Sequence, residues 1–275
     1  MSDELYWAEF DGNVWPRKGQ IGNATTSHAP ALAVYKDVLF CVFTGKNKAL
    51  YWTRWDGSNW SPATPISTFT SGEAPALAVA HDKLYCVHRG ASDTKLYSVT
   101  FSNNTWESER IEISGASSPL GPGLTAYRGN VYCAYQKTDA EVALWVNDGK
   151  QWKDTEKPMS GEVKGSPTLA AYQARLWCAY PGREEGSSLN WSTYVEPSWR
   201  LQQDFPQYVD GSQPALCVYS GLLHCFHVDT DGTSLVWSTS RGDGWSQDQW
   251  TGLVSKTAAG LAPLKDKLYC VYVNP

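Results

Sequence analysis

The chain repeats one pattern six times, and this repetition limits its possible folds more than any other feature. A segment that reads Pro-x-Leu-x-x-Tyr, or a variant of it, recurs at intervals of 45, 47, 45, 47 and 45 residues. A second segment with a central Cys begins nine residues after each of these positions. The six repeats start at Pro30, Pro75, Pro122, Pro167, Pro214 and Ala259. Repeats of this length are typical of solenoids and propellers.

Each repeat contains four short segments of strand type. The third has Leu followed by an aromatic residue, as in Leu50-Tyr51-Trp52, and the fourth carries one Trp. An Asp-Gly turn joins the third segment to the fourth in several repeats, for example at Asp56-Gly57, and such turns are typical of tight hairpins. Four antiparallel strands per repeat of about 46 residues predict an all-β, six-bladed β-propeller.

The two ends of the chain carry complementary halves of one repeat. The chain begins with third- and fourth-strand segments and ends with first- and second-strand segments. We therefore expect a single propeller domain over residues 1–275, in which residues 1–22 complete the blade begun by residues 259–275. Such shared closure removes the open sheet edges on which chains aggregate.

Composition and charge exclude several classes of protein. The formal net charge is -5, and we expect no nucleic-acid partner, because phosphate binding relies on clustered Lys and Arg. No stretch approaches the roughly 18 consecutive apolar residues of a membrane span, so no membrane insertion is expected. Met1–Phe10 lacks the basic and apolar regions of a secretory signal. The 14 Trp and 15 Tyr provide many rings with a polar group, a usage enriched at interfaces.

The cysteines point to a reducing compartment. Six of the seven occupy one equivalent mid-strand position, where each Cys is expected to be a small buried hydrophobe. Free thiols without a signal indicate a cytoplasmic protein, with release by a non-classical route left open. His224 and His227 point to opposite faces of a strand and cannot share a metal ion. We expect no metal, no cofactor and no catalytic residues.

The predicted ligand sites lie on the face where the longer loops gather, in shallow pockets between blades. Sugars stack their C–H faces on aromatic rings and bond their hydroxyls to a few fixed polar groups. Strand two of every repeat ends in an aromatic residue or His, although packing between blades is an equally good explanation of these rings. The candidate rings are His88, Tyr135, Tyr180 and His227. The candidate polar residues are His28, Glu73, Arg89, Gln136, Arg183 and Asp229. Four Trp of the third strands complete the set, namely Trp7, Trp52, Trp191 and Trp237.

The run from Pro30 to Trp60 resembles the repeat of β-propeller lectins, and the likeness extends over essentially the whole chain. Photorhabdus-type lectins have a similar blade that reads PA…V…G…LY…WDG…W, in rings of seven. Fungal fucose lectins have six blades, but their Arg-Glu-Trp sugar triad is not evident in every repeat here. The resemblance implies a multivalent carbohydrate-binding protein, or agglutinin, that recognises glycans or glycoproteins in defence or recognition.

Two other functions stay open. Propellers also serve as protein–protein interaction scaffolds, because a fold does not determine a function. The Asp-Gly-x-x-Trp turn partly resembles the Asp box of sialidases, so a sialidase-like glycosidase is a third reading. Glycosidases generally need two carboxylates in one cleft, and no such pair stands out in the sequence.

Overall fold

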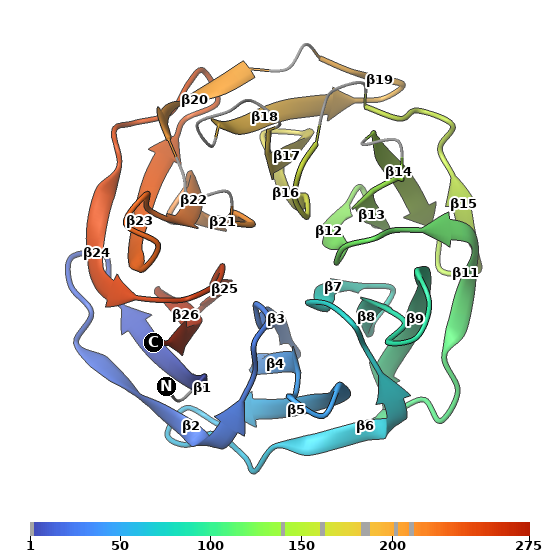
Figure 1. Ribbon diagram of the computed structural model, residues 1–275, viewed down its shortest axis with the longest axis horizontal. Helices are drawn as coiled ribbons and strands as arrows, with labels where there is room; N and C mark the ends of the chain where they lie inside the picture. Colours follow the sequence, from blue (N-terminus) through green and yellow to red (C-terminus); the bar gives the residue numbers. More distant parts are fainter. Residues whose placement is uncertain (1–2, 139–140, 160–162, 183–187, 201–202, 209–211) are drawn as a thin grey trace.

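Six antiparallel sheets form a ring in the computed structural model (Figure 1). The structure describes residues 3–138, 141–159, 163–182, 188–200, 203–208 and 212–275. The first blade comprises β3 (Ala31–Tyr35), β4 (Val38–Thr44), β5 (Ala49–Trp55) and β6 (Thr64–Thr70). The second comprises β7 (Ala76–Ala80), β8 (Lys83–Arg89), β9 (Lys95–Ser102) and β11 (Ile111–Ser117), with the short β10 (Thr105–Trp106) beside β9. The third comprises β12 (Gly123–Tyr127), β13 (Asn130–Gln136), β14 (Val142–Asn147) and β15 (Trp152–Asp154).

The other three blades follow the same order from the centre outward. The fourth comprises β16 (Thr168–Tyr172), β17 (Arg175–Pro181), β18 (Ser188–Val195) and β20 (Gln203–Tyr208), with the short β19 (Ser198–Trp199) beside β18. The fifth comprises β21 (Ala215–Tyr219), β22 (Leu222–Val228), β23 (Ser234–Ser240) and β24 (Gln249–Val254). The sixth comprises β25 (Gly260–Leu264), β26 (Lys267–Asn274), β1 (Glu4–Phe10) and β2 (Arg17–Thr25). The predicted six-bladed propeller is therefore confirmed.

The sixth blade closes the ring with both ends of the chain. β1 pairs with β26 in continuous antiparallel register from Glu4 opposite Asn274 to Phe10 opposite Leu268. Figure 1 shows the blue N-terminal strand beside the red C-terminal one. The predicted closure by terminal strands is confirmed. None of the described residues forms a helix long and apolar enough to cross a membrane.

Tight hairpins join the inner strands, and the core lies between neighbouring blades. Lys36 and Asp37 both have positive φ, of 49° and 60°, as the two central residues of a type I′ hairpin require. The apolar residues fall into clusters that bridge successive sheets rather than fill one centre. All seven cysteines are buried and free, and the sequence had predicted this for the six at the shared position. The boundaries between blades, called junctions below, are therefore where packing and any cavities occur.

Most outer strands also carry a bulge. In β2 the register shifts between Glu4 opposite Thr25 and Tyr6 opposite Gln20. Ile21 and Ala24 point inward within this bulge and are buried. The bulge bends the outer strand against the next blade, and this shape creates the larger of the two hollows described below.

Candidate functional site

The predicted rings at the ends of the second strands lie inside the junctions. His88, Tyr135, Tyr180 and His227 are between 0% and 3% exposed. The ring of His88 stacks on Tyr97 with centroids 5.8 Å apart. Burial lowers the pKa of His88 to about 4, so it is neutral at pH 7. These four rings contribute to packing between blades and offer little surface to a ligand from solution.

Three of the predicted polar residues come together on the loop side of the first two blades. A guanidinium nitrogen of Arg89 lies 3.8 Å from a carboxylate oxygen of Glu73. Burial raises the pKa of Glu73, and the charges of His28 and Arg89 oppose that effect. The side chains of Glu73 and Arg89 are about a quarter exposed, so solvent screens this ion pair only in part.

The remaining predicted polar residues are placed elsewhere. The Gln136 amide donates a hydrogen bond of 2.7 Å to the Val163 carbonyl. The Asp229 carboxylate accepts one of 2.7 Å from the Thr230 backbone. The Gln136 contact joins β13 to the segment that leads from the third blade to the fourth, whereas the Asp229 contact stays within its own loop. Arg183 lies outside the described residues.

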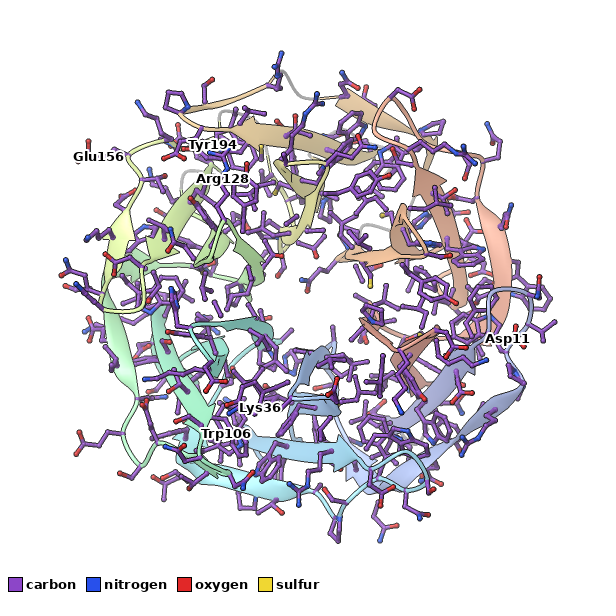
Figure 2. The ribbon with its side chains drawn as sticks, turned by 180° about the vertical axis from the view of Figure 1, so that it is seen from behind. Asp11, Lys36, Trp106, Arg128, Glu156 and Tyr194 are labelled. Atoms are coloured by element: carbon purple, nitrogen blue, oxygen red, sulfur yellow. The ribbon has the colours of Figure 1, made fainter. Side chains whose placement is uncertain are left out.

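The four predicted Trp mark the junctions between blades. The centroids of Trp7 and Trp55 are 4.6 Å apart across the junction of the sixth and first blades. Those of Trp52 and Phe101 are 5.5 Å apart across the next junction, and Trp237 and Phe10 are 4.9 Å apart where the fifth blade meets the sixth. Trp191 packs on Trp177 at 4.8 Å. Figure 2 labels Trp106, which adds a further ring beside Trp52 at 6.3 Å.

Strand register gives the residues that occupy these aromatic positions in the other blades. Trp52 lies opposite Val42, and the corresponding pairs place Ser98 opposite Val87 and Leu144 opposite Ala134. In the third blade Val142 takes the place of Leu50, so Leu144 is equivalent to Trp52, although the sequence Leu144-Trp145 resembles Leu50-Tyr51.

The junction of the second and third blades lacks the aromatic pair. Ser98 stands where the first blade has Trp52, and Asn147, opposite Val131, stands where the second blade has Phe101 opposite Leu84. Two small polar side chains leave the space of two large rings unfilled. The result is a cavity of about 290 Å³, which we call the Ser98 cavity.

Polar groups and aromatic rings line the Ser98 cavity together. Thr100 lines the cavity, and its hydroxyl oxygen is buried without a hydrogen-bond partner. An unpaired buried hydroxyl costs free energy, so a small turn of this side chain toward a ligand hydroxyl would satisfy it. Tyr85 and Trp152 supply ring surface.

The carboxylates at the rim of the Ser98 cavity are paired with lysines. Lys83 lies 3.9 Å from Glu107, and Lys95 lies 2.9 Å from Glu112. A further lysine, Lys150, also lines the cavity. The charges at the rim therefore do not favour a cation.

A larger hollow of about 710 Å³ lies between the sixth and first blades. The bulge of β2, the loop after β4, Tyr51 and the segment from Trp60 to Ala63 line it. We call it the Tyr51 pocket. The described residues contain no cluster of three or more His, Cys, Asp or Glu side chains that would hold a metal ion.

Sequence reasoning missed both hollows for the same reason. It searched for residues shared by all repeats, whereas the hollows occur where one repeat departs from the others. The segment Leu96-Tyr97-Ser98 already differs from Leu50-Tyr51-Trp52 at its last residue. That difference was the signal that could have identified the Ser98 cavity.

Comparison with known proteins shows similarity of fold at low sequence identity. No protein-family model matches the chain, and no curated protein matches it either. A mutant of the Aleuria aurantia lectin in complex with Fucα1-6GlcNAc is similar over 87% of this chain and 86% of its own, at 15% identity and a TM-score of 0.66. AofleA from Arthrobotrys oligospora is similar over 98% and 83%, at 11% identity and a TM-score of 0.68.

A sialidase also shares the architecture. The Trypanosoma rangeli sialidase in complex with sialic acid matches 93% of this chain and 55% of its own, at 12% identity and a TM-score of 0.62. The expected resemblance to fungal six-bladed propeller lectins is confirmed at the level of fold.

Proposed function

We propose that this protein is a carbohydrate-binding protein, a lectin, and that the Ser98 cavity binds a saccharide. The observation that carries the proposal is the replacement of an aromatic pair by Ser98 and Asn147, which opens a cavity with an unpaired Thr100 hydroxyl. A core that only needed stability would have kept the rings, because cavities and unpaired polar groups are destabilising.

The chemistry of the cavity suits a sugar. A pyranose has one weakly polar C–H face for Trp152 or Tyr85, and hydroxyls that both donate to and accept from Thr100 and Asn147. Its volume of about 290 Å³ is at the small end of ligand sites, which favours one terminal residue of a glycan. The sugar complexes of structurally similar lectins support the class of ligand.

Binding without catalysis is part of the proposal. Glu107 and Glu112 both line the cavity, and a glycosidase would need one of two such carboxylates to carry a proton. Both acids instead form surface ion pairs with lysines, as described above. Incubation with aryl glycosides, including an aryl sialoside, should therefore release no phenol.

A glycan array with labelled protein, followed by titration with the best monosaccharide, tests the proposal. The variant Ser98→Trp/Asn147→Phe restores the aromatic pair of the preceding junction and should abolish binding in the cavity without loss of thermal stability. Arg128→Ala is the control. Arg128 lies on the third blade, and its removal breaks a half-exposed ion pair with Glu196 of the fourth blade. This variant should bind as the wild type does. A blank array with folded protein would reject the lectin and direct the search to protein partners.

A further inference from the structure

The Tyr51 pocket is a second hollow with a different construction. One ring face of Tyr51 is covered by Phe43, with centroids 5.6 Å apart and planes inclined by 16°. The ring edge lies against Gly45, where an added Cβ would stand 2.7 Å from the Tyr51 ring. Tyr51 is thus held by a neighbour and by close backbone approach, while it also lines the pocket.

The junction of the first and second blades contains the same arrangement, but there the side chain of Arg110 fills the space. Tyr97 occupies the position of Tyr51, and its hydroxyl donates a hydrogen bond of 3.0 Å to Asp93. His88 stacks beside Tyr97, as Phe43 stacks beside Tyr51. The guanidinium carbon of Arg110 lies 3.7 Å from the centroid of Tyr97, a distance that places it directly over the ring face.

Arg110 also makes a polar contact across the junction. Its guanidinium donates a hydrogen bond of 3.2 Å to the Thr70 carbonyl of the first blade. The guanidinium of Arg110 therefore shows what this type of pocket accepts. It is a planar group that lies flat against the tyrosine ring and donates a hydrogen bond to the outer strand of the preceding blade.

Ala63 replaces this arginine in the Tyr51 pocket. Tyr51 pairs with Pro65 and Tyr97 pairs with Glu112, so the residues two positions earlier, Ala63 and Arg110, are equivalent. Thr25 corresponds to Thr70 by the same comparison of register, because Glu4 and Ala49 are equivalent first residues of their strands. The volume that Arg110 fills at one junction is left open at the other.

The local charges favour a neutral occupant. Asn47 stands beside Tyr51 where Asp93 stands beside Tyr97, and its amide donates a hydrogen bond of 3.0 Å to the Tyr51 hydroxyl. Lys46 lies 2.9 Å from Asp3, which also binds Lys256 at 2.7 Å. These lysines hold the pKa of Asp3 at about 2. Among the described residues that line the pocket there is no carboxylate to attract a cation.

We propose that the Tyr51 pocket binds a neutral pyranose whose C–H face lies on Tyr51 in the place of the missing guanidinium. Its hydroxyls face Asn47, Asn23 and Thr25, all of which line the pocket. This inference rests on the proposed lectin function, and it gives the chain a second saccharide site that differs from the Ser98 cavity in its residues and its junction.

The test uses six proteins and a panel of methyl α-L-fucoside, methyl β-D-galactoside and methyl β-D-glucoside. Calorimetric titration compares the wild type and Ser98→Trp/Asn147→Phe, and it compares Ala63→Arg and Thr64→Arg, each alone and each added to Ser98→Trp/Asn147→Phe. Ala63→Arg places an arginine at the position equivalent to Arg110, so that this side chain should cover Tyr51 and fill the pocket. Thr64→Arg adds the same charge one exposed position further along and serves as its control.

We expect at least one glycoside to bind Ser98→Trp/Asn147→Phe. Ala63→Arg added to that variant should weaken this binding at least tenfold. Thr64→Arg added to the same variant should leave the binding unchanged. Loss of all binding in Ser98→Trp/Asn147→Phe overturns the second site and leaves the lectin function standing. Binding that Ala63→Arg alone abolishes supports the Tyr51 pocket and rejects the Ser98 cavity. No binding by the wild type rejects both.

Discussion

The hydroxyl of Tyr269 donates a hydrogen bond of 2.8 Å to the carboxylate of Glu9, which joins residues 260 positions apart in the chain. Glu9 lies on β1 and is 6% exposed, and Tyr269 lies opposite it on β26. Arg17 of β2 approaches the same carboxylate to 3.6 Å. One of the two partners of this buried carboxylate, Tyr269, thus reaches it only when the two ends of the chain meet in the sixth blade.

Tyr269→Phe should destabilise the closed ring. The change leaves the Glu9 carboxylate buried with one partner fewer, at a cost of about 1–3 kcal/mol. Urea denaturation measures it. Tyr35→Phe is the control, because the Tyr35 hydroxyl donates to a neutral carbonyl, that of Asp82, and its loss should cost less. Equal costs for the two variants would show that the Glu9 contact does not contribute specially to closure.

Trp52→Ser should create a second cavity like that beside Ser98. Removal of a large buried ring typically costs about 3–5 kcal/mol. Trp52 packs on both Phe40 and Phe101 but is only partly buried, so we expect a cost below that range. Thermal unfolding should register a large drop, whereas Ser98→Trp should leave the midpoint unchanged or raise it. A drop for Ser98→Trp would mean that the Ser98 cavity is too narrow for a ring and that the comparison of junctions is misleading.

The seven thiols should be inert in the folded protein. Burial raises the pKa of Cys86 and of Cys217 to about 12, and the thiolate is the reactive form. A colorimetric disulfide reagent at pH 8 should detect no rapid thiol in the native state and seven after unfolding in urea. Rapid reaction of even one equivalent under native conditions would contradict the buried positions described here.

Stability should fall as pH is lowered from about 6.5 to about 4, in part through His88. Burial lowers the pKa of His88 to about 4, the positive charge of Arg110 adds to this, and Asp93 opposes it weakly. Between these pH values His88 takes up a proton in the unfolded chain but not in the native protein. The contribution of His88 to the free energy of unfolding is therefore complete above about pH 6.5 and is lost as the pH falls toward about 4. His88→Tyr copies Tyr135 of the third blade.

The measurement is the slope of unfolding free energy against pH for the two proteins. His88→Tyr should remove up to one proton from the uptake that accompanies unfolding between pH 6.5 and 4. An unchanged slope would show that His88 is protonated in the native state. His224, whose pKa is also lowered by burial, remains in both proteins and cancels in the comparison.

The repeat spacing predicted the number of blades, their strand count and the closure by both termini because these depend on patterns that every repeat shares. The burial of the cysteines followed from the same reasoning. Each feature involves a periodic position where local preference and packing require the same type of residue. Sequence alone therefore reached the architecture and the environment of residues such as Cys86.

The candidate sites could not be predicted in the same way. His88 and Tyr135 look alike in a repeat whether their rings face solvent or a neighbouring blade, and only the packing of successive sheets shows that they are buried. The Ser98 cavity depends on a residue that comes from the next blade, Asn147. The difference between Ala63 and Arg110 needs the register of two bulged outer strands. Such pairs are set by tertiary contact and leave no local pattern.

The pairing of β1 with β26 also bears on synthesis in the cell. Because β1 is synthesised before its inner neighbour β26, it finds this partner only after residues 267–274 have emerged from the ribosome, when the strands of the other five blades have already been made. Contacts of such long sequence separation are slow to form because the chain first has to lose loop entropy. The nascent protein thus exposes an unpaired β1 edge from the synthesis of β1 until that of β26, and a chaperone that covers this edge would have that interval in which to act.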